Sequence, residues 1–93
     1  MRLFNSLKVI DKRAFEGCTN MTGIVLPKSL EKIGDYAFCN CKKMFSIKIP
    51  PNVKQIGKSA FQGCEKLTIY CRKDSYADTY AKKYGIPVKY MPL

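Results

Sequence analysis

Five cysteines are the side chains of this sequence whose type suits metal binding, disulfide formation or nucleophilic catalysis. They are Cys18, Cys39, Cys41, Cys64 and Cys71. An odd number excludes a complete set of disulfides within one chain. The sequence contains no His, so no imidazole can activate a thiol, and nucleophilic catalysis is disfavoured. Paired C-x-x-C knuckles are absent, so the spacing does not indicate a zinc site.

Three of the cysteines, Cys18, Cys41 and Cys64, lie 23 residues apart. A repeat of this kind aligns thiols in a row instead of converging them on one metal ion. We therefore expect buried, reduced thiols that act as small apolar side chains, and a disulfide between neighbours in the row is the alternative. Cys39 and Cys71 lie outside the row and are expected to be accessible.

No other pattern points to catalysis. The six glycines are scattered instead of forming a phosphate-binding loop, and no pair of carboxylates recurs at a useful spacing. The sequence predicts a protein that is not an enzyme and that uses no cofactor and no metal.

The 23-residue period extends to apolar residues over most of the chain, and this is the strongest signal in the sequence. The recurring positions include Ile10, Ile33 and Ile56; Ala14, Ala37 and Ala60; Phe15, Phe38 and Phe61; and Met21, Met44 and Leu67. Stacking such units places like residues over one another at the spacing of neighbouring strands and builds a continuous core.

Each unit predicts a short strand, at residues 24–26 and 47–49, that ends at Pro27 or Pro50. Residues 29–33 and 52–56 then form the return of the chain. Gly34 and Gly57 are expected to permit a turn there.

The motif I-G-x-x-A-F-x-x-C, present at residues 33–41 and 56–64, resembles the BspA-type leucine-rich repeat; the first unit departs from it, with Asp11 in place of the glycine. The resemblance implies an α/β repeat solenoid, a right-handed leucine-rich-repeat stack with short parallel strands. It also implies a cell-surface or secreted protein that binds host proteins or other cells.

The end of the chain predicts a cap. Asp74 or Ser75 can begin a helix that Gly85 ends, and residues 88–90 can add a last strand. The expected buried stripe of this helix is Tyr76, Ala77, Tyr80, Ala81 and Tyr84. We predict one domain over residues 1–93: a remnant of a preceding repeat at 1–8, three repeats at 9–73 with the last truncated, and the cap at 74–93.

The formal net charge of +10 favours acidic partners. Two columns alternate in sign and predict ion-pair ladders: Lys8, Glu31 and Lys54, and Lys12, Asp35 and Lys58. The unbalanced cations include Lys42, Lys43 and Lys66, which form a candidate site for polyanions, although solubilising lysines would give the same pattern.

Two aromatic residues break columns that are otherwise polar. Phe45 is aligned at the 23-residue period with Thr22 and Thr68, and Tyr36 with Arg13 and Ser59. Such residues are candidate binding hot spots. Val25 and Lys48 are expected at outward positions of the strands. Val25, Lys48, Phe45 and Tyr36 are the four predicted partner-binding residues.

The predicted function is non-catalytic binding to a protein, possible ligands being host or extracellular-matrix proteins, through the stacked-strand face. The alternatives are electrostatic binding of an acidic glycan or nucleic acid, and a spacer with no ligand of its own. No segment is long and apolar enough to span a bilayer, and residues 1–8 lack the core of a signal peptide. The uncapped N-terminal edge predicts self-association.

Overall fold

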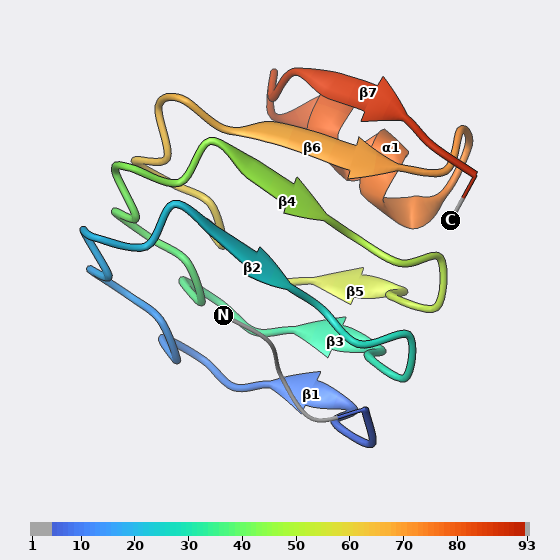
Figure 1. The fold of residues 1–93 in the computed structure, drawn as a ribbon, viewed down its shortest axis with the longest axis horizontal. Helices are drawn as coiled ribbons and strands as arrows, with labels where there is room; N and C mark the ends of the chain where they lie inside the picture. Colours follow the sequence, from blue (N-terminus) through green and yellow to red (C-terminus); the bar gives the residue numbers. More distant parts are fainter. Residues whose placement is uncertain (1–4, 93) are drawn as a thin grey trace.

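The protein is a stack of parallel strands in two sheets, closed at one end by a helix, as Figure 1 shows. A computed structural model describes residues 5–92, so half of the predicted remnant at 1–8 lies outside the described residues. One sheet has the order β1-β3-β5, with bounds Val9–Ile10, Lys32–Ile33 and Gln55–Ile56. The other has the order β2-β4-β6-β7, with bounds Gly23–Val25, Ser46–Lys48, Thr68–Cys71 and Val88–Tyr90. Helix α1 spans Tyr76–Lys83.

The predicted repeat is confirmed by the register of the strands. Ile10 lies beside Ile33, which lies beside Ile56, and Ile24 lies beside Ile47. The return segments, which were predicted only as a reversal of the chain, pair with one another and form the sheet β1-β3-β5. Like side chains therefore stack along the axis and form the buried core of residues 5–92.

An aromatic column fills the centre of the stack. The rings of Phe15 and Phe38 are 5.4 Å apart at an interplanar angle of 9°, and those of Phe38 and Phe61 are 5.4 Å apart at 3°. Offset aromatic pairs of this kind add about 0.5–1.5 kcal/mol each to the gain from burial. The column ends at the helix, where the Tyr80 ring lies edge-on to Phe61 with its centroid 6.2 Å away.

The glycines that follow β3 and β5 begin the predicted turns, because the carbonyls of Gly34 and Gly57 accept the N–H groups of Ala37 and Ala60 at 3.2 and 3.3 Å. Close packing of neighbouring repeats is the further reason for a glycine at these positions. Neither Gly34 nor Gly57 has a positive φ. A Cβ atom on Gly34 would lie 2.6 Å from the backbone nitrogen of Lys12, and one on Gly57 would clash with Asp35. The backbones of adjacent repeats approach too closely there for any side chain.

The third repeat is one residue shorter at its strand, and this changes the surroundings of Phe45. Ser46 pairs with Thr68, at a separation of 22 residues. The residue that would follow Leu67 in register with Phe45 is missing. The predicted alignment of Phe45 with Thr68 is therefore wrong: Thr68 belongs to the next position, and Phe45 has no counterpart in the last repeat.

The predicted ion-pair ladders are largely wrong. Of their pairs, Lys8 with Glu31 is the one formed among residues 5–92, at 3.7 Å and well exposed. The Asp35 carboxylate instead accepts the backbone N–H of Lys58 at 2.9 Å. The Asp35 carboxylate lies close to the backbone of the next repeat, so it can accept a hydrogen bond from the N–H group there. Pairing with the ammonium group of Lys58 would require ordering a long lysine side chain.

The helix begins as one of the two predicted caps suggests, and it buries a narrower face than predicted. Ser75 is the N-cap, and its hydroxyl accepts the N–H of Asp78 at 3.3 Å. Ala77, Tyr80 and Ala81 are buried. Tyr76 and Tyr84, expected on the same face, are 39% and 52% exposed. They lie at the two ends of the helix, beyond the part that the last repeat covers.

Candidate functional site

The outer face of the four-stranded sheet brings together two of the four predicted partner-binding residues, Val25 and Lys48. Val25 pairs with Lys48, and Lys48 with Tyr70, across β2, β4 and β6. Their neighbours along each strand are buried, so these side chains point outward. Lys89 of β7 continues the row beside Tyr70. We call this row the strand face: an apolar residue at one edge, then two lysines on either side of a tyrosine.

Phe45 lies immediately before β4 and is the most exposed of the large apolar side chains described, at 57%. Its backbone bridges its neighbours, because its N–H donates to the Thr22 carbonyl and its carbonyl accepts from Thr68, both at 3.0 Å. The backbone of Phe45 is therefore fixed by the sheet, while its side chain is largely exposed to solvent. An exposed aromatic side chain on an ordered backbone is a candidate binding hot spot.

A groove of about 580 Å³ follows β2, β4 and the turn at Pro50 and Pro51. Val25 and Lys48 both line it, whereas Phe45 and Tyr36 do not. No pattern in the sequence indicated this groove, because the groove depends on how the strand ends and the proline turn lie side by side.

Tyr36 is separate from the strand face. It belongs to the turn that follows β3, in the other sheet, and is half-buried. The Arg13 guanidinium lies over its ring, 4.5 Å from the centroid. Both residues have positive φ values, 61° for Arg13 and 58° for Tyr36, and Ser59 of the next repeat has 55°. The column is thus set by a left-handed backbone, and Tyr36 packs against Arg13 within it.

The three lysines of the polyanion alternative lie on two neighbouring turns. Lys42 and Lys43 precede β4, and Lys66 occupies the corresponding turn before β6. All three are exposed, and within residues 5–92 none forms an ion pair. Lys42 and Lys43 lie within three residues of Phe45 in the sequence, and Lys66 lies two residues before Thr68, whose N–H donates to the Phe45 carbonyl.

The cysteine row is present, and its thiols are hydrogen-bonded. The Cys41 thiol donates to the Phe15 carbonyl at 3.2 Å, and the Cys64 thiol donates to the Phe38 carbonyl at 3.0 Å. All five cysteines are free. Burial raises the pKa of Cys41, and it raises the pKa of Cys64 to about 11. These thiols are consequently poor nucleophiles at neutral pH.

The prediction that Cys39 and Cys71 are accessible is wrong. Cys39 is 5% exposed and Cys71 is 0% exposed. Cys71 ends β6, where helix α1 and β7 cover the sheet, and burial raises its pKa. A cysteine outside the 23-residue column is therefore not necessarily exposed, because some residues of the turns and of the cap region are also buried.

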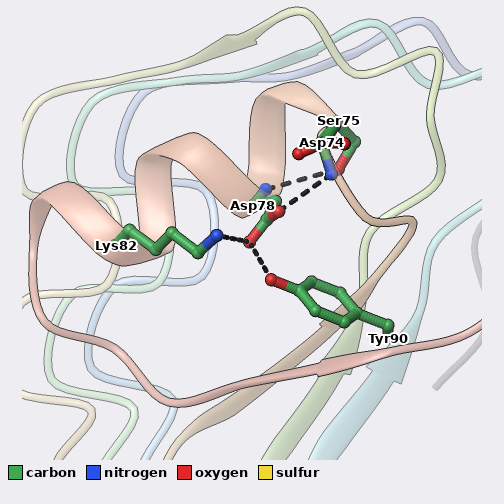
Figure 2. Close-up of polar contacts among 5 residues, drawn as sticks. All are labelled: Asp74, Ser75, Asp78, Lys82 and Tyr90. Atoms are coloured by element: carbon green, nitrogen blue, oxygen red, sulfur yellow. Dashed lines mark hydrogen bonds and ion pairs between the residues drawn. The ribbon is translucent and has the colours of Figure 1, made fainter.

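Asp78, which was not among the residues predicted from the sequence, is the one charged residue buried within residues 5–92, and Figure 2 shows its contacts. It is 1% exposed. Its carboxylate accepts the backbone N–H of Asp74 at 2.8 Å and the hydroxyl of Tyr90 at 3.1 Å, and the Lys82 ammonium lies 3.5 Å away. The spacing Ser-x-x-Asp at Ser75 and Asp78 resembles a capping box and was the available signal.

The contacts of Asp78 set its pKa and hold the cap together. Burial alone would raise the pKa of Asp78, but the Asp74 N–H, the Tyr90 hydroxyl and the Lys82 charge outweigh it, and the net pKa is lowered. The ionised carboxylate thus connects the start of α1 to β7. This arrangement is structural, and it stabilises the end of the sheet that carries the strand face.

Comparison with known proteins agrees with this architecture. A model of the BspA type leucine rich repeat region (6 copies) matches residues 1–81. The chain belongs to the BspA-type leucine-rich repeat family. Such repeats act in protein interaction and are typically non-catalytic, and BspA-type proteins are commonly surface-associated. Searches of curated proteins and of solved structures gave no match.

Two further observations concern the site of this BspA-type stack. Within residues 5–92, no helix has the length and apolar character needed to cross a bilayer. The same residues contain no group of three or more His, Cys, Asp or Glu side chains placed to hold a metal ion.

Proposed function

We propose that this chain is a protein-binding module of a cell-surface or secreted BspA-type protein and that it binds through the strand face together with Phe45, which immediately precedes β4. The observation that carries the proposal is Phe45, whose side chain is 57% exposed and whose backbone is hydrogen-bonded on both sides. Interface hot spots are enriched in such aromatic anchors, with charged side chains around them. Lys48 and Lys89 supply that polar rim, and they favour an acidic partner surface.

The proposal is tested by binding to a panel of purified extracellular-matrix proteins, measured by surface plasmon resonance. Phe45→Ala should weaken binding by about 2 kcal/mol, the loss typical of a hot-spot residue. Val9→Ala is the matched control, because Val9 is a 41% exposed apolar residue of the other sheet. Equal effects of the two substitutions, or binding that neither changes, would count against the strand face.

The second candidate function is electrostatic binding of an acidic glycan or a nucleic acid at Lys42, Lys43 and Lys66. It is favoured by the lack of ion pairs at these exposed lysines among the described residues and by the net charge of +10. Fluorescence anisotropy with a labelled acidic polysaccharide and a labelled DNA duplex, at about 50 and 200 mM salt, tests it. Affinity that falls steeply with salt and is abolished by reversing the three charges would favour this candidate over the first.

A further inference from the structure

The turn after the last return strand carries three backbone N–H groups for which the stack supplies no acceptor. In the preceding repeat, alternate N–H groups of the equivalent turn donate to carbonyls of the next repeat. The pairs are Tyr36 to Lys58 at 3.0 Å, Phe38 to Ala60 at 2.8 Å and Asn40 to Gln62 at 2.7 Å. The first repeat makes the same bonds, from Arg13, Phe15 and Gly17 to Asp35, Ala37 and Cys39.

The equivalent donors of the last repeat are the N–H groups of Ser59, Phe61 and Gly63, and none has a partner within residues 5–92. The backbone follows the same path as in the turn below, since φ is 55° at Ser59 and 82° at Gly63, against 58° at Tyr36 and 62° at Asn40. The three N–H groups therefore point along the stack, to the place that another repeat would occupy.

The helical cap leaves this place partly open. A cleft of about 420 Å³ lies between the turn and the end of the cap, and all three donor residues line it. Tyr80 covers the Phe61 ring and donates its hydroxyl to the Gly57 carbonyl at 3.2 Å, so the core itself is closed. The far wall includes Tyr84, whose ring is 52% exposed, and Pro87.

We propose that this cleft binds a turn of polypeptide main chain from a partner protein, whose alternate carbonyl oxygens accept the N–H groups of Ser59, Phe61 and Gly63. In both lower repeats the three equivalent N–H groups donate to alternate main-chain carbonyls, so the spacing of the donors already fits that ligand. A main-chain ligand would replace the water that the open cleft admits to these three N–H groups with hydrogen bonds in a fixed geometry. Because Glu65 also lines the cleft, its carboxylate disfavours an anionic ligand.

This site lies on the turn side of the last repeat, apart from the strand face, so it adds a second contact to the proposed function and does not depend on it. Phe45→Ala should leave it unchanged. A partner that engages both surfaces would gain affinity through linkage of two weak contacts.

The first measurement is amide hydrogen exchange of the full chain by NMR. We expect the amides of Phe38 and Asn40 to be protected, and those of Ser59, Phe61 and Gly63 to exchange much faster. Protection of these three equal to that of Phe38 in the free chain would show that they already have acceptors, and would overturn the proposal.

The second measurement is an NMR titration with a blocked peptide copied from residues 58–63. In the peptide, Ser59→Gly permits the left-handed backbone, and Phe61→Ser avoids the position that Tyr80 already fills. Saturable shifts of the three amides would support the proposal. Shifts that appear elsewhere, or no shifts at millimolar peptide, would overturn it. Shifts that depend on the concentration of the protein and not on the peptide would also overturn it, because a second copy of the chain would then be the occupant.

Three variants and one small anion complete the test. Tyr84→Ala removes an aromatic wall of the cleft and should weaken peptide binding about fivefold, the scale of one lost aromatic contact. Tyr76→Ala, at the other end of the same helix and outside the cleft, should have no effect. Equal weakening by both would overturn the proposal. Saturable binding of acetate at the three amides, if Glu65→Lys strengthens that binding, would also overturn the proposal, because the site would then be an anion site.

Discussion

Replacing Asp78 with Asn tests whether charge-assisted hydrogen bonds hold the cap on the stack. The substitution keeps the size of the side chain and removes its negative charge. In the structure this carboxylate is 1% exposed and contacts Asp74, Tyr90 and Lys82. An amide keeps one of the two acceptor oxygens and places an NH₂ group at the other position, where it faces a donor.

The expected loss in the free energy of unfolding is about 2 kcal/mol. Hydrogen bonds to a charged group contribute about 1.5–3 kcal/mol and neutral ones about 0.5–1.5, and the substitution converts or breaks the bonds from the Asp74 N–H and the Tyr90 hydroxyl. The Lys82 pair adds little because its ammonium group is largely exposed. In a domain of this size about 2 kcal/mol corresponds to a fall in Tm of about 8–16 °C.

The pH dependence gives the prediction its sign. The pKa of Asp78 is lower in the folded chain than its ordinary value, so its contribution to stability is fully present above the unfolded pKa, about 3.9, and is lost as the pH falls through the folded pKa. Asp78→Asn should therefore cost about 2 kcal/mol at pH 7 and progressively less below about pH 4.

Urea denaturation of both proteins at several pH values, followed by circular dichroism, measures this difference. Glu65→Gln is the control, because Glu65 is exposed and forms no ion pair among the described residues. A stability difference for Asp78→Asn that is as small as that of the control, or that stays constant down to pH 2.5, would refute the reasoning.

Three further predictions concern the stack itself. Gly34→Ala should lower the free energy of unfolding by about 2–3 kcal/mol, because the new Cβ would overlap the neighbouring backbone. Gly17 has open space around a Cβ and a φ of 73°, so Gly17→Ala should lower it by only about 1 kcal/mol. Urea denaturation compares the two variants. Cys64 should react with a maleimide at pH 8 about 100-fold more slowly than an ordinary thiol, because its thiolate is scarce, and mass spectrometry measures the rate; a Cys64 as fast as a free thiol would contradict its raised pKa. Tyr80→Phe should cost about 1 kcal/mol by removing one hydrogen bond, and a neutral result in thermal denaturation would show that water replaces it.

Most of the architecture could be predicted from spacing alone, because a solenoid repeats its contacts with its sequence. Phe15, Phe38 and Phe61 share a column in the sequence and a stack of rings in space. The N-cap at Ser75 and the last strand at Val88–Tyr90 followed from local signals that need no tertiary knowledge.

What could not be predicted depends on contacts between elements of different kinds. The burial of Asp78 and Cys71 comes from the cap, which has no repeat to reveal it. The surroundings of Phe45 changed because a deletion of one residue shifts the register from 23 to 22, as the pairing of Ser46 with Thr68 shows.

The candidate site was predictable in part for the same reason. Val25 and Lys48 are placed by strand alternation, which the sequence displays. Tyr36 lies elsewhere because its left-handed backbone and the Arg13 contact position it on a turn of the other sheet. The unpaired N–H groups of the last repeat arise where the period stops, and a column pattern carries no record of which end of the stack lacks an acceptor.

Hydroxyl-radical footprinting of Phe45, in the chain alone and in complex with the best binder of the matrix-protein panel, tests the central claim most directly. The account predicts that oxidation of the Phe45 ring falls severalfold in the complex while oxidation of Tyr76, exposed on the cap, stays unchanged. Unchanged oxidation of Phe45 in a saturated complex, or a panel in which no protein binds, would contradict it.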